Sequence, residues 1–174
     1  IGFPLLIKAS AGGGGKGMSI VREAGSLEKQ AKIAMSEAER YFADSRIYAE
    51  LYVESPRHIG VQILGDGKGN IVHAYERECS IQRRFQKVIE ESPAPALSVE
   101  LRDQICTAAV DLASKAKYLN AGTVEFILSP DGSFYFLEMN TRLQVEHPVT
   151  EMVCSLDLVE AQLHIADSNT LPYR

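Results

Sequence analysis

The stretch from Phe134 to Glu151, FYFLEMNTRLQVEHPVTE, constrains the fold more than any other part of this chain. Its first half has the period-two alternation of a strand, which predicts that Phe134, Phe136, Glu138 and Asn140 share one face. An acid and an amide would then point the same way from a strand otherwise built of large apolar residues. A half-buried strand gains no stability from such a pair, so the pattern indicates a site.

The second half of the stretch continues with polar residues at the same two-residue interval. Arg142, Gln144 and Glu146 follow one another before Pro148. If the backbone stays extended as far as the proline, a cation, an amide and a second acid line one side. This row predicts a binding site for a small anion with a base beside it. Arg142 would hold the charge of the anion and, as a nearby cation, lower the pKa of Glu146 and keep it ionised. The alternative is an Arg142–Glu146 ion pair that only pins the loop.

A second strand is predicted directly upstream, because Gly122–Leu128 is rich in β-formers and Asp131-Gly132 is a strong hairpin signal. With Asp131 and Gly132 at the corners of the loop, Pro130 faces Ser133. The predicted register then pairs Leu128 with Tyr135, Phe126 with Leu137, and Glu125 with Glu138.

Two facing glutamates need an explanation. Directly opposed side chains have Cβ atoms about 5 Å apart, where like charges repel. A cation between Glu125 and Glu138, with Asn140 one step along, would resolve the conflict. All-oxygen ligation favours Mg²⁺ or Mn²⁺. The alternative is that one glutamate is solvated at a sheet edge, since a register slip of one residue separates the pair.

Length and charge exclude several classes of protein. A chain of 174 residues is one ordinary domain or a large fragment of a longer chain, and 45 % hydrophobic with 24 % charged residues is globular. A net charge of −5 without a Lys/Arg block argues against nucleic acid as a partner. No apolar run reaches the ~18 residues of a membrane span, and no signal peptide is visible.

Two further features concern the origin of the chain. The widely spaced Cys79, Cys106 and Cys154 are expected to be reduced thiols in a reducing compartment. The sequence begins at Ile1, without Met, in what reads as a strand already under way. We therefore expect an excised piece of a longer protein.

A glycine run follows the first predicted strand. Residues 12–17 hold five glycines and Lys16, with Lys8 shortly before them. The run formally matches G-x-G-x-x-G, but a dinucleotide loop should open a helix, whereas residues 18–22 read as a returning strand. It is not a Walker A loop either, because glycine follows Lys16. The run predicts a glycine hairpin whose amides close over phosphates; the alternative is a flexible surface turn.

The remaining segments read as an ordinary α+β domain. His58 falls in a predicted turn and is by itself a surface residue. The run from Glu76 to Glu91 is dense in charge without a helical stripe and is interpreted as a solvated loop. The alternative is a polar cluster suited to an anion, formed by Gln82, Arg83, Arg84 and Lys87. Helices are predicted from the Ser26 cap to Phe42, after the Ser98 cap, and over Leu156–Ile165; further strands are predicted over Ile47–Val53, Ile59–Leu64 and Asn70–Glu76.

Together these features predict an enzyme that activates a small oxyanion with ATP. The features are a glycine flap with lysines, a carboxylate pair for metal, and the row of Arg142, Gln144 and Glu146. The chain resembles, from end to end, the ATP-grasp domain of biotin carboxylases. The motifs that carry the resemblance are IKASAGGGGKGM, ESPRHI, ERECSIQRRFQK, AGTVEF and EMNTRLQVEHPVTE.

The resemblance implies an α+β ATP-grasp fold with two lobes, mainly antiparallel sheets and covering helices. A small glycine-flap lobe is expected over about residues 1–53, and a larger lobe for metals and bicarbonate over about 54–174. The flanking amino-terminal and carboxyl-terminal domains of a biotin carboxylase are expected to be missing from this piece, so that the piece alone is expected to be inactive.

The resemblance also implies roles for individual residues. ATP would be bound by Lys8, Gly14, Gly15, Met18, Glu50, Leu51, Tyr52, Val53, His58, Gln82, Glu125 and Glu138. Within this set, residues 50–53 would contact the adenine, largely through main-chain atoms. Metal would be held by Glu125, Glu138 and Asn140, and bicarbonate by Lys87, Arg142, Gln144 and Val145. Arg142, Glu146 and Lys87 would be catalytic, with Glu146 as the base. Leu51, Gly60 and Phe85 depart from residues common in the family (lysine, glutamate and histidine).

The implied reaction is the ATP-dependent carboxylation of biotin on a carrier protein, through Mg-ATP activation of bicarbonate to carboxyphosphate. The chain would belong to the biotin carboxylase component of an acyl-CoA carboxylase, or of a pyruvate or urea carboxylase. Expected partners are the biotin carboxyl carrier protein, a carboxyltransferase and further copies of the longer enzyme, in the cytoplasm or, in a eukaryote, the mitochondrial matrix. Two alternatives stay open: a regulatory nucleotide-binding module without turnover, and a bicarbonate kinase like that of carbamoyl-phosphate synthetase.

Overall fold

A computed structural model describes residues 1–12 and 16–172 of the chain. The predicted phosphate contacts of Gly14 and Gly15 therefore lie outside the described residues. The chain divides into two compact units. The small unit comprises Ile1–Glu54 with Arg83–Gln86, and the large unit comprises Ser55–Gln82 with Lys87–Arg174.

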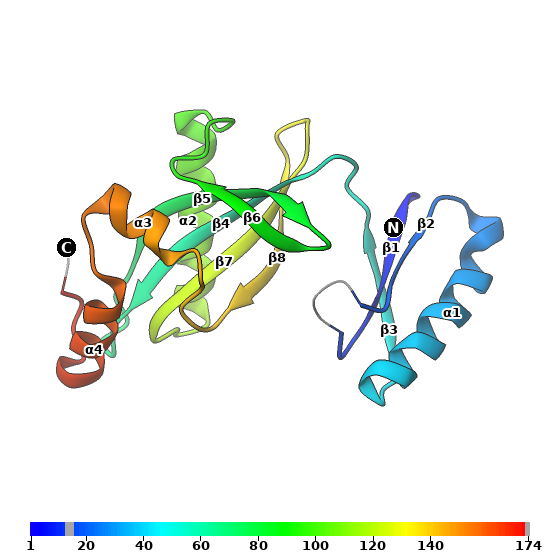
Figure 1. The fold of residues 1–174 in the computed structure, drawn as a ribbon, viewed down its shortest axis with the longest axis horizontal. Coiled ribbons are helices and arrows are strands. Elements are labelled where there is room, and N and C mark those ends of the chain that lie inside the picture. Colours follow the sequence, from blue (N-terminus) through cyan, green and yellow to red (C-terminus); the bar gives the residue numbers. More distant parts are fainter. Residues whose placement is uncertain (13–15, 173–174) are drawn as a thin grey trace. The chain divides into compact units, whose positions relative to one another are not determined.

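The small unit is a three-stranded antiparallel sheet with one helix. Its strands are β1 (Leu5–Ala9), β2 (Met18–Val21) and β3 (Ile47–Leu51), in the order β2-β1-β3. Helix α1 (Ala24–Phe42) runs along this sheet (Figure 1) and buries Ala34 and Ala38. It begins two residues before the predicted cap Ser26, with Glu23 in the cap position. The core is small, formed by Leu5, Ile7, Val21 and Ala34.

The large unit is built on a five-stranded sheet in the order β6-β5-β4-β7-β8. The strands are β4 (Arg57–Gly65), β5 (Ile71–Arg83), β6 (Gln86–Glu91), β7 (Asn120–Leu128) and β8 (Phe134–Asn140). Helix α2 (Val99–Lys115) covers one face, behind the strands in Figure 1. Its N-terminus is capped as predicted, since the Ser98 hydroxyl accepts from Leu101 N at 3.2 Å.

Two short helices complete the large unit. Helix α3 (His147–Cys154) was not predicted, whereas α4 (Leu158–Ser168) corresponds to the last predicted helix. Leu158 and Ile165 of α4 pack on Leu64 and Ala121, where β4 ends and β7 begins. The main core lies on the α2 side of the sheet, and there alternate residues of β4 and β7 are apolar.

The opposite face of this sheet is polar and still buried. Val124, Phe126 and Leu128 of β7 enter the core, so Thr123 and Glu125 point to the other face. Both are fully or almost fully buried. Helices α3 and α4 reach this face: Thr150 of α3 accepts from Arg77, and Leu158 of α4 packs with Ala121, which lies on the same side of β7 as Thr123. The buried polar residues beside these helices mark where a site is expected.

A β-bulge divides β8 and corrects the predicted register. On the turn side the pairs are Leu128 with Phe134 and Phe126 with Phe136, one residue away from the prediction. On the far side the predicted pair of Glu125 with Glu138 is confirmed. The extra residue also reverses the alternation, because Phe134 packs against the core on Phe126 at 5.6 Å between ring centroids. The prediction that Phe134 shares a face with Glu138 was therefore wrong.

The charged run between Glu76 and Glu91, predicted to be a loop, forms the second half of β5 and all of β6. These two strands meet in a tight turn at Arg84 and Phe85, which have φ angles of 52° and 64°. Left-handed backbone is rare for such residues, and a two-residue hairpin usually carries glycine or asparagine there. The hairpin left no turn signal in the sequence.

Candidate active site

The polar face of the large unit holds a charged cluster, which we define as His58, Gln82, Lys87, Glu125, Gln144 and Glu146. Lys87 on β6 is its centre. The Lys87 ammonium lies 2.6 Å from Glu125 Oε1 on β7 and also donates to Glu146 Oε1, which precedes α3. One cation thus joins two carboxylates from strands and turns far apart in the sequence.

Glu125 uses both of its oxygens. Oε1 accepts from Lys87 and from Gln144 Nε2, the latter at 2.8 Å, and Oε2 lies 2.7 Å from His58 Nε2. Gln82 Nε2 donates to Cys79 O and to His58 Nδ1, both at 2.8 Å. Because Nδ1 of His58 is thereby an acceptor, Nε2 carries the proton and donates it to Glu125. His58 is a half-buried member of the cluster and not the surface residue that its turn alone suggested.

The cluster keeps Glu125 ionised. Burial raises the pKa of this carboxyl, which is 2 % exposed, but hydrogen bonds from His58, Lys87 and Gln144 outweigh burial and lower the pKa to about 2. The desolvated carboxylate is thus stabilised by three donors.

Glu146 and Lys87 hold each other in their charged forms. Burial raises the pKa of Glu146, but the hydrogen bond and charge of Lys87, a backbone hydrogen bond and the charge of Arg77 together lower it below its ordinary value. Burial likewise lowers the pKa of Lys87, and its two carboxylate partners raise it more. The sequence assigned the ionising role to Arg142; the structure gives it to Lys87, with a contribution from Arg77.

Arg77 was missed by the sequence interpretation. It lies on β5, is fully buried, and its guanidinium donates to Gln62, Thr123, Gln144 and Thr150 at 2.8–3.1 Å. Its Nε is buried, and no described residue accepts a hydrogen bond from it. The only signal was an arginine inside a charged run, and that run was taken for a solvated loop.

The predicted metal ligands lie together at one place in the sheet. Glu138 faces Glu125, and Asn140 faces Thr123 on the same strand pair. Glu138 is exposed and Asn140 is half-buried. Within the described residues no group of three or more His, Cys, Asp or Glu side chains forms a metal site.

The predicted row of Arg142, Gln144 and Glu146 is not an extended strand. Strand β8 ends at Asn140, the chain turns at residues 145–146, and Pro148 lies in the first turn of α3, where its missing N–H costs nothing. Gln144 and Glu146 enter the cluster. Arg142 is exposed and donates to Leu143 O at 3.2 Å, and Val145 is 91 % exposed. Among the described residues, neither a hydrogen bond nor an ion pair joins Arg142 to Glu146, whose ionic partner is Lys87.

The small unit has its own lysine–glutamate pair. Lys8 Nζ on β1 lies 2.5 Å from Glu50 Oε2 on β3. Met18 pairs with Lys8 in the sheet, and Tyr52 N donates to Pro4 O at 3.1 Å just after β3 ends. Leu51 and Phe85 are both exposed, at 47 % and 65 %. Val53 is half-buried.

Gly60, which also departs from the family pattern, lies directly between two residues of the site. It pairs with Glu125 on one side and with Arg77 on the other. A Cβ there would meet Thr123 Cγ2 at 3.2 Å and Glu125 Cγ at 4.0 Å. The glycine therefore leaves the surface above Glu125 without a side chain at this position.

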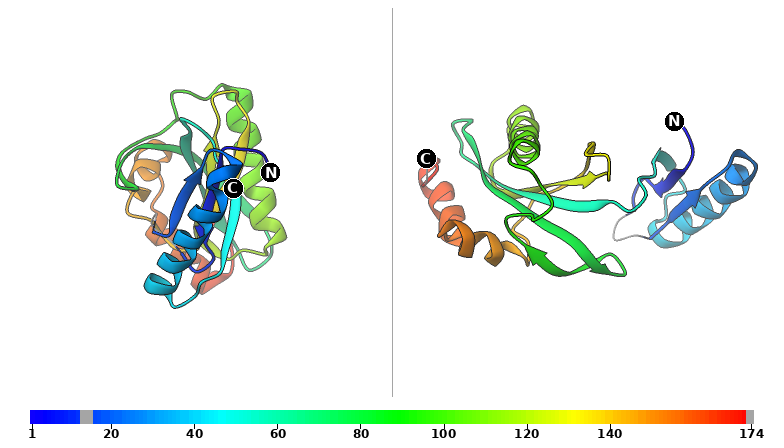
Figure 2. Two further views of the ribbon diagram at one scale, coloured as in Figure 1. Left: turned by 90° about the vertical axis from the view of Figure 1, so that its right-hand side faces the viewer. Right: turned by 90° about the horizontal axis from the view of Figure 1, so that it is seen from above.

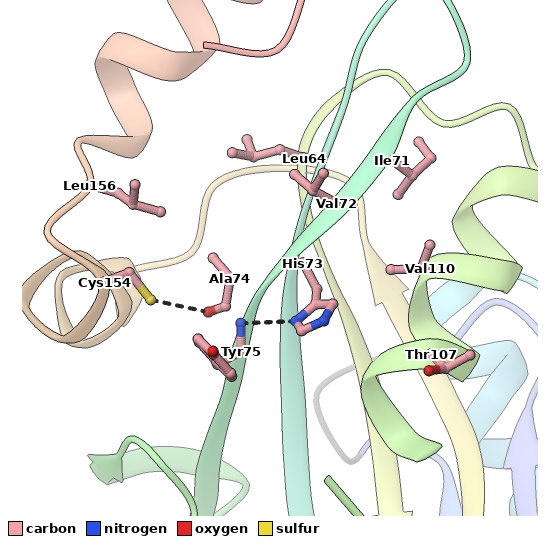
Figure 3. A pocket seen from close by; sticks show the side chains of 10 residues that line it. All are labelled: Leu64, Ile71, Val72, His73, Ala74, Tyr75, Thr107, Val110, Cys154 and Leu156. Atoms are coloured by element: carbon pink, nitrogen blue, oxygen red, sulfur yellow. Dashed lines mark hydrogen bonds between the residues drawn. The ribbon is translucent and has the colours of Figure 1, made fainter. Parts of the chain in front are cut away.

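A separate apolar groove of about 540 Å³ opens elsewhere on the large unit (Figure 3). It lies between β5, α2 and the end of α3, and its lining comprises Leu64, Ile71, Val72, His73, Ala74, Tyr75, Thr107, Val110, Cys154 and Leu156. None of these residues belongs to the charged cluster. This groove is therefore separate from the candidate site.

Comparison with known proteins identifies the family. The model of the carbamoyl-phosphate synthase L chain ATP-binding domain matches residues 1–174. The chain belongs to this ATP-grasp family. Within it, the chain is 57 % identical to the mitochondrial methylcrotonoyl-CoA carboxylase subunit alpha of Dictyostelium discoideum over 172 residues, or 99 % of this chain and 25 % of that protein. The predicted resemblance to biotin carboxylase ATP-grasp domains is confirmed.

Solved structures agree. The Campylobacter jejuni biotin carboxylase–β-γ-ATP complex superimposes with a TM-score of 0.94 at 48 % identity, covering 98 % of this chain and 38 % of that one. The biotin carboxylase domain of Hydrogenobacter thermophilus 2-oxoglutarate carboxylase, in complex with MgADP, ADP and bicarbonate, gives 0.92 at 47 %, covering 99 % and 38 %. The predicted α+β ATP-grasp fold is confirmed, with both sheets antiparallel in every register described (Figure 2).

The chain spans 25 % of the carboxylase subunit and 38 % of each of these two solved chains. Among the described helices, none combines the length and the apolar character needed to cross a bilayer.

Proposed function

We propose that this chain is the nucleotide- and bicarbonate-binding part of an ATP-dependent biotin carboxylase. The proposal is carried by one observation: Lys87 joins Glu125 and Glu146 in a buried cluster that also contains Gln144 and His58. A carboxylate in reach of metal, a cation, an amide donor and a second carboxylate are what binding and deprotonating a small oxyanion at a phosphate requires. The relatives named as biotin carboxylases, one of them with bicarbonate and MgADP, support the assignment.

The donor set suits Mg²⁺ or Mn²⁺. Glu125 and Glu138 face each other, Asn140 follows on the same strand, and all three offer oxygen. Such ions accept one or two carboxylates and complete their shell with water and substrate phosphates, so two carboxylates and an amide suffice. When bound, the ion would neutralise charge on the transferred phosphate. Holding it would fall to Glu125, Glu138 and Asn140.

The small unit would contribute to nucleotide binding. Lys8 is 15 % exposed in its side chain and carries a charge suited to phosphate oxygens, and its partner Glu50 opens the segment 50–53 for which main-chain adenine contacts were predicted. Met18, Leu51, Tyr52 and Val53 would line the base. In the large unit, His58 and Gln82 would lie near the nucleotide. Their shared hydrogen bond keeps the two side chains together.

Bicarbonate would be held by donors of this chain. We assign it to Lys87 and Gln144, with Arg142 and the Val145 amide closing over it from the exposed turn between β8 and α3. A bicarbonate oxygen then attacks the γ-phosphorus, the bond from that phosphorus to the β–γ bridging oxygen breaks, and ADP leaves with the electron pair. The product is carboxyphosphate, which separates into carbon dioxide and phosphate.

Glu146 would remove the remaining proton of bicarbonate. Its carboxylate is charged at neutral pH because Lys87 lowers its pKa, so it can accept the proton at Oε1 or Oε2. Lys87 would then exchange one carboxylate partner for the substrate. Biotin N1′ then attacks the carbon of carbon dioxide, and the N1′ proton passes to the phosphate released with that carbon dioxide. The product is carboxybiotin on the carrier.

The deciding experiment uses the full-length protein with free biotin. We expect ADP release that depends on both bicarbonate and Mg²⁺, rises with biotin, and transfers ¹⁴C from bicarbonate to biotin. Nucleotide binding without turnover would contradict the proposal and favour a regulatory module. Labelled carbamoyl phosphate formed from ammonia, without carboxybiotin, would favour the carbamoyl-phosphate synthetase chemistry after which the family model is named.

The longer protein would need a biotin carboxyl carrier and a carboxyltransferase. The relative in which this domain makes up 25 % of a carboxylase subunit supports such partners. Assembly with further copies of itself, and a cytoplasmic or mitochondrial location, remain parts of the same proposal.

A further inference from the structure

Arg77 is the one charged residue at the site whose position the reaction does not explain. Its side chain is fully buried, and taking a guanidinium out of water is costly unless its hydrogen bonds are met. Four of its bonds go to neutral acceptors on four segments: Gln62 on β4, Thr123 on β7, Gln144 before α3 and Thr150 within α3. Within residues 1–12 and 16–172, Arg77 forms no ion pair with an aspartate or glutamate.

The bond to Gln144 has a directional consequence. Arginine has donors only, so the carboxamide oxygen of Gln144 must face it, and Oε1 does so at 3.0 Å from Arg77 Nη2. The amide nitrogen consequently points the other way, where it donates to Glu125 Oε1 at 2.8 Å. If the amide were flipped, its N–H group would face the Arg77 guanidinium, which is also a donor, and its oxygen would face the Glu125 carboxylate, which is also an acceptor. Both contacts would be repulsive.

The orientation decides what the site offers to a ligand. An amide nitrogen has two protons; one goes to Glu125, and the described part of the chain holds no partner for the other. With Arg77 behind it, Gln144 presents a donor and not an acceptor, next to the Lys87 ammonium. Such a surface selects an oxyanion.

We propose that Arg77 is a positioning residue that fixes the Gln144 carboxamide, so that its N–H group faces the bound bicarbonate. This deepens the proposed function and rests on it. Arg77 acts through Gln144 and touches neither nucleotide nor bicarbonate, so its loss weakens one substrate and spares the other.

Steady-state ADP formation by the full-length protein tests this with Arg77→Lys. Lysine keeps the charge but lacks the planar fork that spans two pairs of acceptors. We expect the KM for bicarbonate to rise about 10- to 100-fold, as for a lost charge-assisted bond, with the KM for ATP within about twofold. An unchanged bicarbonate KM in the folded variant overturns the proposal, and so does an equal rise of both KM values, which marks general loss of structure.

Arg102→Lys is the matched control. Arg102 pairs with Glu76 at 2.8 Å, also on β5 but on the side of α2, and has no contact with the cluster. This variant should lower the Tm and leave both KM values unchanged. A bicarbonate defect of equal size in Arg102→Lys would overturn the proposal.

Gln144→Glu tests the same geometry with Arg77 intact, and decides the matter if Arg77→Lys does not fold. If Arg77 aims at residue 144, the new carboxylate pairs with it, and the Tm stays within about 3 °C while the bicarbonate KM rises. If Arg77 does not face residue 144, the new carboxylate lies unpaired beside Glu125 and lowers the Tm strongly. That result overturns the proposal. Failure of the proposed function shows differently, as absence of bicarbonate-dependent ADP formation in the unmodified protein.

Discussion

Two lysine–glutamate sites, one in each unit, use the same chemistry in different surroundings. Lys8 makes one contact with Glu50, whose side chain is 41 % exposed. Lys87 joins Glu125 and Glu146, which are 2 % and 9 % exposed, and Glu125 has two further donors. The lysines themselves are equally sheltered, at 15 % and 16 %. The burial of the acids, and not of the lysine, separates the two sites.

The difference shows at which of the two sites the ion pairs contribute most to stability. Water screens an exposed carboxylate, so its ion pair contributes little, whereas two carboxylates in a buried sheet face depend on their cation. The Lys87 site should therefore respond strongly to substitution, and the Lys8 site should respond mainly through ligand binding.

The largest effect is expected from Glu146→Gln in the full-length enzyme. Loss of a general base should lower turnover by about 10²–10⁴-fold, with the KM for ATP and the Tm little changed. The alternative role is an ion pair with Lys87 that only pins the turn before α3. A variant whose stability falls in proportion to its activity supports pinning, and near-normal turnover excludes Glu146 as the base.

Lys87→Met in the 174-residue chain should come next. Removing the cation leaves Glu125 and Glu146 buried without compensation, which should reduce the free energy of unfolding by about 3–5 kcal/mol. Urea denaturation at pH 7 measures it, with Lys8→Met as the matched control at about 1 kcal/mol or less. Equal losses at the two lysines would show that burial of the acids does not set the difference.

Acid should weaken the large unit through Glu125. Its pKa is about 2 when folded against 4.5 ordinarily, so its stabilisation is complete above pH 4.5 and is lost as pH falls towards 2. Integrated over that window the effect is at most about 3 kcal/mol. Urea denaturation between pH 2 and 6 should show a gap between wild type and Glu125→Gln that narrows with acid. A gap constant with pH would mean that Glu125 titrates normally.

Glu50→Gln should have the smallest effect. An exposed pair contributes about 0–1 kcal/mol, so the free energy of unfolding should change by no more than that in urea denaturation. Sodium chloride should abolish whatever difference exists, because surface pairs are screened. A loss above about 2 kcal/mol would place this pair in the same class as the Lys87 cluster.

The sequence predicted what depends on local chemistry. The Asp131-Gly132 signal predicted one hairpin, and Ser98 predicted the start of a helix. The Glu125–Glu138 pair followed from the predicted hairpin register, although the pairs nearer the turn lie one residue away from it. What it could not predict was decided by tertiary contacts. Arg84 and Phe85 hold a turn without turn residues, so the second hairpin was invisible. Arg77 is charged and looks solvated until its four acceptors converge from distant segments.

The interpretation of the row after β8 failed for the same reason. Alternation alone placed Arg142, Gln144 and Glu146 on one side, but Pro148 favours the start of a helix as readily as the end of a strand. Helix α3 turns the chain at Glu146, and Gln144 is drawn inward by Arg77 and Glu125. Their final partners could be found only from the fold.

The bulge in β8 separates the length of the hairpin loop from the position of the carboxylates. The strands pair in one register near Ser129–Ser133 and in another at Glu138. A residue gained or lost at the tip can be absorbed where the ladder is already broken, without carrying Glu138 to the other face. This loop is thus a place where related sequences can differ in length, and where a tag or probe can be inserted, while the paired acids keep their register.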